Sequence, residues 1–240
     1  MTVRALRAQT KLELLLTLRR GEAVLLTLII PVGLLVFFGT TQLFAVTVEF
    51  ITPGLLALAV LSSSLVSLSI ATGYERKYLV LKRLGATPLP RSVLFVAKAI
   101  SVLALEILQV GLLLGVADLL FGWRADIDWW LLTGALLLGT AAFSGVAMLM
   151  AGTLRAEATL ALANGLYVTF LLVGDVIFPL ESLPDAIVRI GQVLPAAPLA
   201  GLFRAAVGQS AFVAAHAVIL IGWALLIPPL AVRFFTWEER

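Results

Sequence analysis

Glu106 is the side chain whose position most directly suggests chemistry, because this carboxylate stands in the middle of a long apolar run. Gln109 follows about one helical turn later and would share a helix face with it. A carboxylate at that depth in a bilayer is costly unless it is paired or faces water. The two side chains could therefore line a path for a polar solute or bind a cation. Alternatively, Glu106 pairs with Lys98, two turns earlier, or carries a proton.

A group of serines lies in the preceding apolar run. Ser63 and Ser67 could line a polar path together with Glu106 and Gln109, or could equally satisfy contacts between helices. The chain has no cysteine, its single histidine has no partner pattern for a metal, and no nucleophile stands beside a base. We therefore expect neither an enzyme nor a directly bound cofactor.

The composition predicts that these residues sit in a membrane. Hydrophobic residues make up 61% of the 240 residues and charged residues 13%. Soluble domains average about 45–50% and about 25%, so a soluble fold could not hide this much apolar surface. The chain carries a net charge of +3, but its basic residues cluster beside apolar runs. Topology and anionic lipid explain that clustering, and we expect no nucleic-acid partner.

Six apolar runs reach the roughly 20 residues that a helix needs to cross a bilayer. The predicted fold is therefore an all-α integral membrane protein with six transmembrane helices in a single transmembrane domain, 1–240. The predicted spans are Ala23–Thr41, Ile51–Gly73, Val93–Leu120, Trp130–Leu154, Ala158–Phe178 and Ala211–Phe234.

The positions of Lys and Arg predict the orientation. If the N-terminus is cytosolic, 14 of the 17 basic residues fall on the cytosolic side of these spans. The positive-inside rule then places both termini and residues 74–91 in the cytosol of a multi-pass protein of the cell membrane. Before the first span, residues 1–22 are predicted to form an interfacial helix, because Arg4, Arg7 and Lys11 share one face at helical spacing.

Two segments outside the spans carry further predictions. Residues 74–91 hold a short charged helix from Glu75 to Leu84, which Gly85 and the following prolines end. Residues 179–210 are too apolar for a solvated loop, and their prolines prevent a single spanning helix. We expect this second segment to form two short extracytoplasmic helices that dip into the membrane and break near Pro195.

Both segments resemble a known family. The pattern E-R-x-x-x-x-L-x-R-L-x-A-T-P from Glu75 to Pro88 resembles the cytosolic motif of ABC exporter permeases of the second type, which export antibiotics, polysaccharides and lipids. Phe-Pro-Leu-Glu-Ser-Leu-Pro at 178–184, then Leu-Pro at 194–195 and Phe-Arg at 203–204, resembles the family's outer segment. The chain departs from the family at Leu79-Val80, where many members have Gly-Thr.

The resemblance implies that residues 74–91 form a coupling helix seated in a separate ATPase subunit, which binds the ATP and Mg²⁺. The sequence agrees, because it contains no G-x-x-x-x-G-K-[ST] phosphate loop. A second permease copy, identical or related, and membrane lipid are the other expected partners. The implied contacts with the ATPase subunit are Glu75, Arg76, Lys77, Leu81, Lys82, Arg83 and Leu84.

Other classes of protein remain open at this point. The basic residues of 74–91 could simply anchor lipid headgroups and enforce topology. A stand-alone secondary transporter or channel would need a buried ion relay, for which the sequence offers only Glu106 and Asp175. A membrane scaffold without transport would need an extended interaction surface, and the sequence offers none. Association with an ATPase would separate the exporter from both alternatives.

Overall fold

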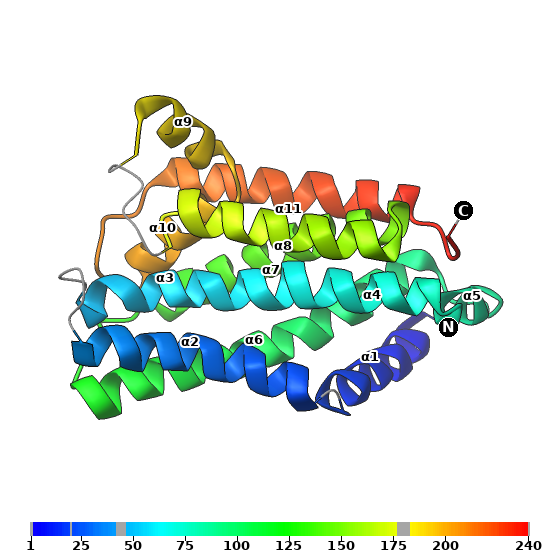
Figure 1. Ribbon diagram of the computed structural model, residues 1–240, viewed down its shortest axis with the longest axis horizontal. Helices are drawn as coiled ribbons and strands as arrows, with labels where there is room; N and C mark the ends of the chain where they lie inside the picture. Colours follow the sequence, from blue (N-terminus) through cyan, green and yellow to red (C-terminus); the bar gives the residue numbers. More distant parts are fainter. Residues whose placement is uncertain (1, 20, 42–46, 177–182, 240) are drawn as a thin grey trace.

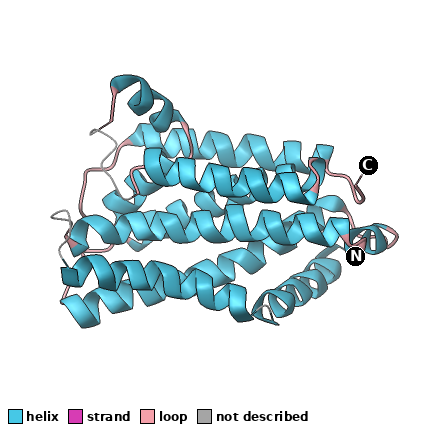
Figure 2. Cartoon of the chain, viewed as in Figure 1, coloured by secondary structure: helices cyan, strands magenta, loops and turns pink. Residues whose placement is uncertain are grey.

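The computed structural model describes residues 2–19, 21–41, 47–176 and 183–239, and across these ranges the chain forms helices and no strands (Figure 2). The helices are α1 (Thr2–Arg19), α2 (Gly21–Thr41), α3 (Val48–Val60), a π-helical segment (Leu61–Ser67), α4 (Leu68–Lys77), α5 (Val80–Gly85), α6 (Arg91–Phe121), α7 (Trp129–Thr153), α8 (Ala156–Val173), α9 (Asp185–Val193), α10 (Ala196–Ala206) and α11 (Ala214–Phe234).

The chain is an all-α integral membrane protein. Five stretches of the described residues are long and apolar enough to cross a bilayer: Val48–Lys77, which joins α3, the π-helical segment and α4, and then α6, α7, α8 and α11. The first predicted span coincides with α2, of which Thr27–Thr41 qualifies as a shorter apolar helix. The fifth predicted span is corrected in length, because α8 already ends at Val173, and residues 177–178 lie outside the described residues.

The long helices run side by side, and both marked termini lie at the same end of the bundle as α5 (Figure 1). We call this the termini end. The stretch Val48–Lys77 is the centre of the bundle: 72% of its apolar window is buried, against 22% for α8 and 11% for α11. Peripheral helices with so much exposed apolar surface are suited to contact with lipid.

Local interactions explain where α6 ends and where α7 begins, at the end of the bundle opposite the termini. Gly122 ends α6 with a φ of 64°, a left-handed conformation that glycine adopts without the steric penalty of a side chain. The Asp128 side chain then accepts hydrogen bonds from the backbone N–H groups of Trp130 and Leu131 and so caps α7.

The segment between α8 and α11 forms two short helices. The described part contains α9 and α10, which meet at Leu194–Pro195 with a bend of 78°. This break agrees with the break that the sequence predicted near Pro195. Residues 179–182 of the predicted segment lie outside the described residues. Helix α10 is almost entirely buried, whereas α9 exposes apolar side chains such as Ile190 and Val193.

One buried arginine fixes α10 in the bundle. The Arg204 guanidinium donates to the Asp175 carboxylate (Nε to Oδ2, 2.9 Å) and to the backbone oxygen of Phe50 (3.0 Å), and it lies over the Phe50 ring. These contacts join α10 to the end of α8 and to the start of α3. A buried guanidinium requires such partners, because burying an unpaired charge costs several kcal/mol.

The closest backbone approach of the central stretch gives a test of the packing. A methyl group at Gly54 would lie 1.9 Å from the backbone oxygen of Val176, whereas nothing lies within 4 Å of one at Gly111. Alanine favours a helix interior over glycine by about 1 kcal/mol, so Gly111→Ala should be neutral or stabilising. Gly54→Ala should destabilise the protein by about 1–3 kcal/mol through overpacking.

Thermal unfolding of the purified variants in detergent measures both effects. A Gly54→Ala protein as stable as the Gly111→Ala control would show that α3 and residue 176 do not approach each other in this way.

Candidate functional site: a polar seam and the α5 handle

Glu106 lies fully buried on α6 between two hydroxyl groups from different elements. Its carboxylate accepts hydrogen bonds from Ser64 of the π-helical segment and from Thr140 of α7. The alternative pairing with Lys98 is wrong, because the Lys98 ammonium contacts the carboxylates of Glu13 and Glu75 instead. Thr140 was not identified from the sequence, since nothing in the pattern of α7 marks a threonine that faces a carboxylate.

Gln109 is also buried and joins three elements. Its side-chain oxygen accepts a hydrogen bond from Ser63 (3.0 Å), and its nitrogen donates to the backbone oxygen of Thr27 on α2 (2.9 Å). Successive serines, Ser63 and Ser64, thus bond to α6 residues one turn apart. The π-helical conformation of Leu61–Ser67 supports this double contact, and single π turns inside α-helices are frequent at functional sites.

A buried ion triad lies nearer the termini end. The Lys98 ammonium contacts the Glu13 carboxylate of α1 (2.9 Å) and the Glu75 carboxylate of α4 (2.7 Å), and its side chain is only 2% exposed. Gln9 donates a further hydrogen bond to Glu13 (2.8 Å). Sequence reasoning missed Glu13, although it and Gln9 lie one turn apart on the side of α1 opposite the basic residues.

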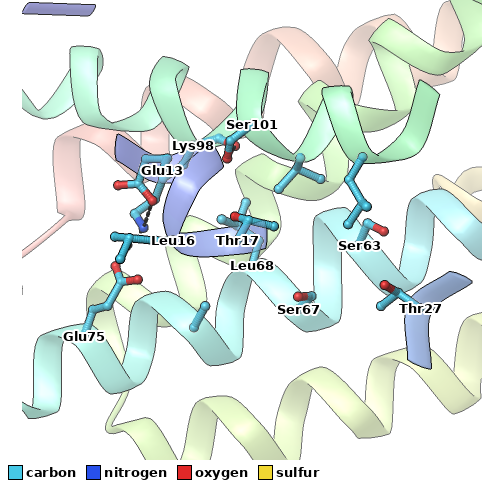
Figure 3. Close-up of a pocket in the computed structure, with 13 residues that line it drawn as sticks. Glu13, Leu16, Thr17, Thr27, Ser63, Ser67, Leu68, Glu75, Lys98 and Ser101 are labelled. Atoms are coloured by element: carbon cyan, nitrogen blue, oxygen red, sulfur yellow. Dashed lines mark hydrogen bonds and ion pairs between the residues drawn. The ribbon is translucent and has the colours of Figure 1, made fainter. Parts of the chain in front are cut away.

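A small, partly open pocket lies between the triad and the serines. Figure 3 shows Lys98, Glu13 and Glu75 at one end of it, with Ser67 and Ser63 further along. Its volume of about 30 Å³ is enough for one or two water molecules, and its lining offers the polar partners that buried water needs.

We call this set of groups the polar seam. It runs between α1, α2, the Val48–Lys77 stretch, α6 and α7, from the ion triad to Glu106. All four residues predicted for a polar path belong to it, although Ser67 contributes only to the cavity lining. Hydroxyls, an amide and paired charges offer hydrogen bonds to solutes and water. Within the described residues no group of His, Cys, Asp and Glu side chains could hold a metal ion. The polar seam consists of Glu13, Thr27, Ser63, Ser64, Ser67, Glu75, Lys98, Glu106, Gln109 and Thr140.

The charged helix predicted from Glu75 to Leu84 is corrected to two pieces. Helix α4 ends at Lys77, and α5 begins at Val80 after a sharp turn in which Leu79 has a φ of 61°. The positive φ carries a steric cost for leucine, so the surrounding structure must hold this turn in place. We call Tyr78–Gly85 the α5 handle.

The handle is fixed to the bundle by one apolar side chain and by its end. Leu81 is fully buried in a cluster with Leu94 of α6 and Phe235 after α11. Gly85 belongs to α5 rather than following it, and a methyl group there would lie 2.7 Å from the Trp237 ring. Glycine is needed at this position for the close approach of Trp237, not for a left-handed turn.

Charged residues around the handle tie it to neighbouring helices. Arg76 is buried and donates to the backbone oxygens of Ala151 and Leu154 at the end of α7, while Lys77 pairs with Glu157 at the start of α8. Lys82 pairs with Glu238 of the C-terminal segment (2.6 Å).

The seven residues predicted to meet a partner therefore divide into two groups. Glu75, Arg76 and Leu81 make contacts within this chain and hold the handle, and Leu84 packs partly against the same apolar cluster. Lys77, Lys82 and Arg83 are exposed, and among the described residues Arg83 has no acidic partner. The exposed surface of the handle also includes apolar side chains that sequence reasoning did not identify: Tyr78 (68% exposed), Leu79 (48%) and Val80 (43%).

The comparison with known families agrees with this architecture. A model of the ABC-2 type transporter family matches residues 4–207, which include the polar seam, the handle and the α9–α10 pair. The chain belongs to the ABC-2 type transporter family and is a multi-pass membrane permease of ABC transporters. Membership implies partnership with an ATP-binding subunit. No curated protein matches the sequence.

The ion triad can be tested by removing its cation. Lys98→Met leaves two buried carboxylates without their partner, which should cost about 3–5 kcal/mol of stability. Adding Glu13→Gln and Glu75→Gln should restore most of the loss, because the remaining groups are neutral. Lys77→Met removes an exposed ion pair and should cost less than about 1 kcal/mol.

Thermal unfolding in detergent compares the three proteins. Equal stability of the Lys98→Met and Lys77→Met variants would contradict a buried triad, as would a triple variant no more stable than Lys98→Met alone.

Proposed function

We propose that this chain is the membrane-spanning subunit of an ATP-driven exporter, and that the α5 handle couples it to a separate ATP-binding subunit. The observation that carries the proposal is the handle itself. The turn before α5 exposes Tyr78 and Leu79 and the helix itself exposes Val80 and Arg83, all at the termini end, while Leu81 anchors the handle to the bundle. A protruding element that is both anchored and partly apolar is suited to dock in a partner and to pass on its motion.

The charge distribution supports the orientation. With 14 of the 17 basic residues on the handle's side of the predicted spans, the termini end is proposed to face the cytosol of a cell-membrane protein. An ATP-binding subunit could then reach the handle. ATP and Mg²⁺ are proposed to bind that subunit, since this sequence has no phosphate loop and its segments between helices are short.

The contacts at the end of α4, directly before the handle, suggest how a movement of the handle would reach other helices. Arg76 and Lys77 connect the end of α4 to α7 and α8, while Glu75 connects it through Lys98 to α6 and α1. Displacement of the handle would therefore pull on four helices through polar contacts. The Arg76 hydrogen bonds and the Lys98 ion pairs are buried and resist gradual stretching, so these contacts favour two discrete arrangements.

The polar seam is proposed to contribute to the translocation path. Glu106 and Gln109 bond to serines in the present arrangement, and both side chains are buried. Separation of the Val48–Lys77 stretch from α6 would free these groups to meet water or a polar part of a substrate. A second permease copy, identical or related, is proposed to complete the path between the two chains. The exposed, uncovered Gly165 region of α8 is one surface suited to close helix packing.

The alternative of a secondary transporter or channel has Glu106 as its main support. Such a protein would transport without ATP. In the proposed exporter, transport stops when ATP is withheld.

Charge reversal on the handle tests the coupling. Lys82→Glu combined with Arg83→Glu should weaken co-purification of the ATP-binding subunit and uncouple ATP hydrolysis from transport. Each reversed charge turns an attraction at a partly buried interface into a repulsion, with a combined cost on the order of several kcal/mol. Membrane insertion and orientation should not change, because Arg76, Lys77 and Arg91 remain as basic residues on the cytosolic side.

Two controls separate the interface from effects within the chain. Lys82→Glu combined with Glu238→Lys keeps an ion pair between positions 82 and 238. Any loss of association in this variant therefore comes from the changed charge on the outer surface of the handle and not from a broken contact within the chain. Arg124→Glu reverses an exposed charge at the opposite end of the bundle and should leave association unchanged. If the Lys82→Glu/Arg83→Glu protein binds the ATP-binding subunit and transports normally, the handle only fixes the topology of the chain, and the coupling proposal is wrong.

A further inference from the structure

A groove that the transport proposal does not use runs along the outside of α1. It is open and has a volume of about 470 Å³. Sites for small ligands fall in the range of about 300–1,000 Å³. The groove is lined by Leu6, Arg7, Thr10, Lys11, Leu14, Leu15, Leu18 of α1 and Ile100 of α6.

The two cations of the groove lie toward the start of α1, beside Leu6, and the rest of the groove toward the end of α1 is apolar. Arg7 and Lys11 are exposed, and neither has an acidic partner among the described residues. The acidic residue of α1, Glu13, points to the opposite side and is held by Lys98. No carboxylate of the described residues therefore competes with a ligand for these two cations.

The direction of α1 matches this division. The helix begins near α5 at the termini end and runs obliquely toward the start of α2 (Figure 1). Arg7 and Lys11 thus lie nearer the end of the bundle, and Leu14, Leu18 and Ile100 lie deeper along it. Leu18 is 60% exposed, so the apolar end is not covered by this chain.

A hydroxyl group lies between the two cations along α1. Thr10 lines the groove, and its side-chain oxygen is buried without a hydrogen-bond partner in the described part of the chain. Orphaned polar atoms of this kind are uncommon in folded proteins and cost free energy unless a partner is supplied.

We propose that this groove binds one anionic phospholipid, with its phosphate between Arg7 and Lys11 and an acyl chain along Leu14, Leu18 and Ile100. The charge is complementary, and the apolar floor lies at the depth where the acyl chain of a lipid would follow its headgroup. A free phosphate would leave that floor exposed. The bound lipid would bridge α1 and α6 on the outside of the Lys98–Glu13 pair and so hold α1 against the bundle.

This inference rests on the membrane architecture and not on coupling to an ATP-binding subunit. It can fail while the transport proposal stands, and the reverse also holds.

Native mass spectrometry of the purified protein tests the site. Phosphatidylglycerol and phosphatidylcholine of equal chain length serve as probes. One phosphatidylglycerol should bind per chain in preference to phosphatidylcholine. Arg7→Gln with Lys11→Gln should weaken phosphatidylglycerol binding about 30-fold, since each basic residue near an anionic lipid contributes about fivefold.

Matched variants identify what the site recognises. Arg19→Gln with Arg155→Gln removes two exposed cations outside the groove and should preserve the preference. Leu18→Gln should weaken both lipids alike, because it alters only the apolar floor at an exposed position. Inorganic phosphate should not displace phosphatidylglycerol.

Three outcomes would overturn the proposal. Equal binding of the two lipids would indicate ordinary surrounding lipid, and displacement by inorganic phosphate would indicate a phosphate site. Conversion of the Arg7→Gln/Lys11→Gln protein to a different oligomeric state, with its lipid binding unchanged, would assign the groove to a contact between copies of this chain.

Discussion

A buried charge must find its partners inside the protein when lipid surrounds it, and this constraint organises the molecule. The Lys98 ammonium is paired with carboxylates from α1 and α4. The Arg204 guanidinium is paired with the Asp175 carboxylate and donates to the backbone oxygen of Phe50. Each cation thereby joins elements that are far apart in the sequence. Such pairs add little net stability compared with apolar packing, but breaking one is expensive. The positions of α1 and α10 are therefore held by ion pairs in which the loss of one partner would leave a buried charge unpaired.

Charged side chains, two of them largely buried and one exposed, also hold the handle in position. Glu75, Arg76 and Lys77 are successive residues at the end of α4, and they point to three different partners: α6, α7 and α8. Leu81 then secures α5 two residues beyond the break at Leu79. A short helix held in this way moves with the bundle rather than independently. Its outer surface exposes Arg83 together with the apolar side chains of Tyr78, Leu79 and Val80.

Apolar run length predicted the spanning helices well, because a bilayer leaves few other solutions for the backbone. The break at Leu194–Pro195 was likewise predicted, since proline cannot continue a helix without losing a hydrogen bond. The turn at Leu79 was not, because leucine favours helix and the positive φ there is imposed by tertiary contacts. Pairings between helices were the other failure: Glu106 meets Ser64 and Thr140 rather than Lys98.

Photo-crosslinking from the handle tests the central claim most directly. A photoreactive amino acid at Val80, which is exposed on α5, should capture the ATP-binding subunit in membranes that contain the assembled transporter. The same group at Leu119, exposed at the opposite end of the bundle, should not. Capture from position 80 alone is the predicted result. Capture from position 119, or from neither position in an assembly that hydrolyses ATP, would contradict the assignment of α5 as the coupling element.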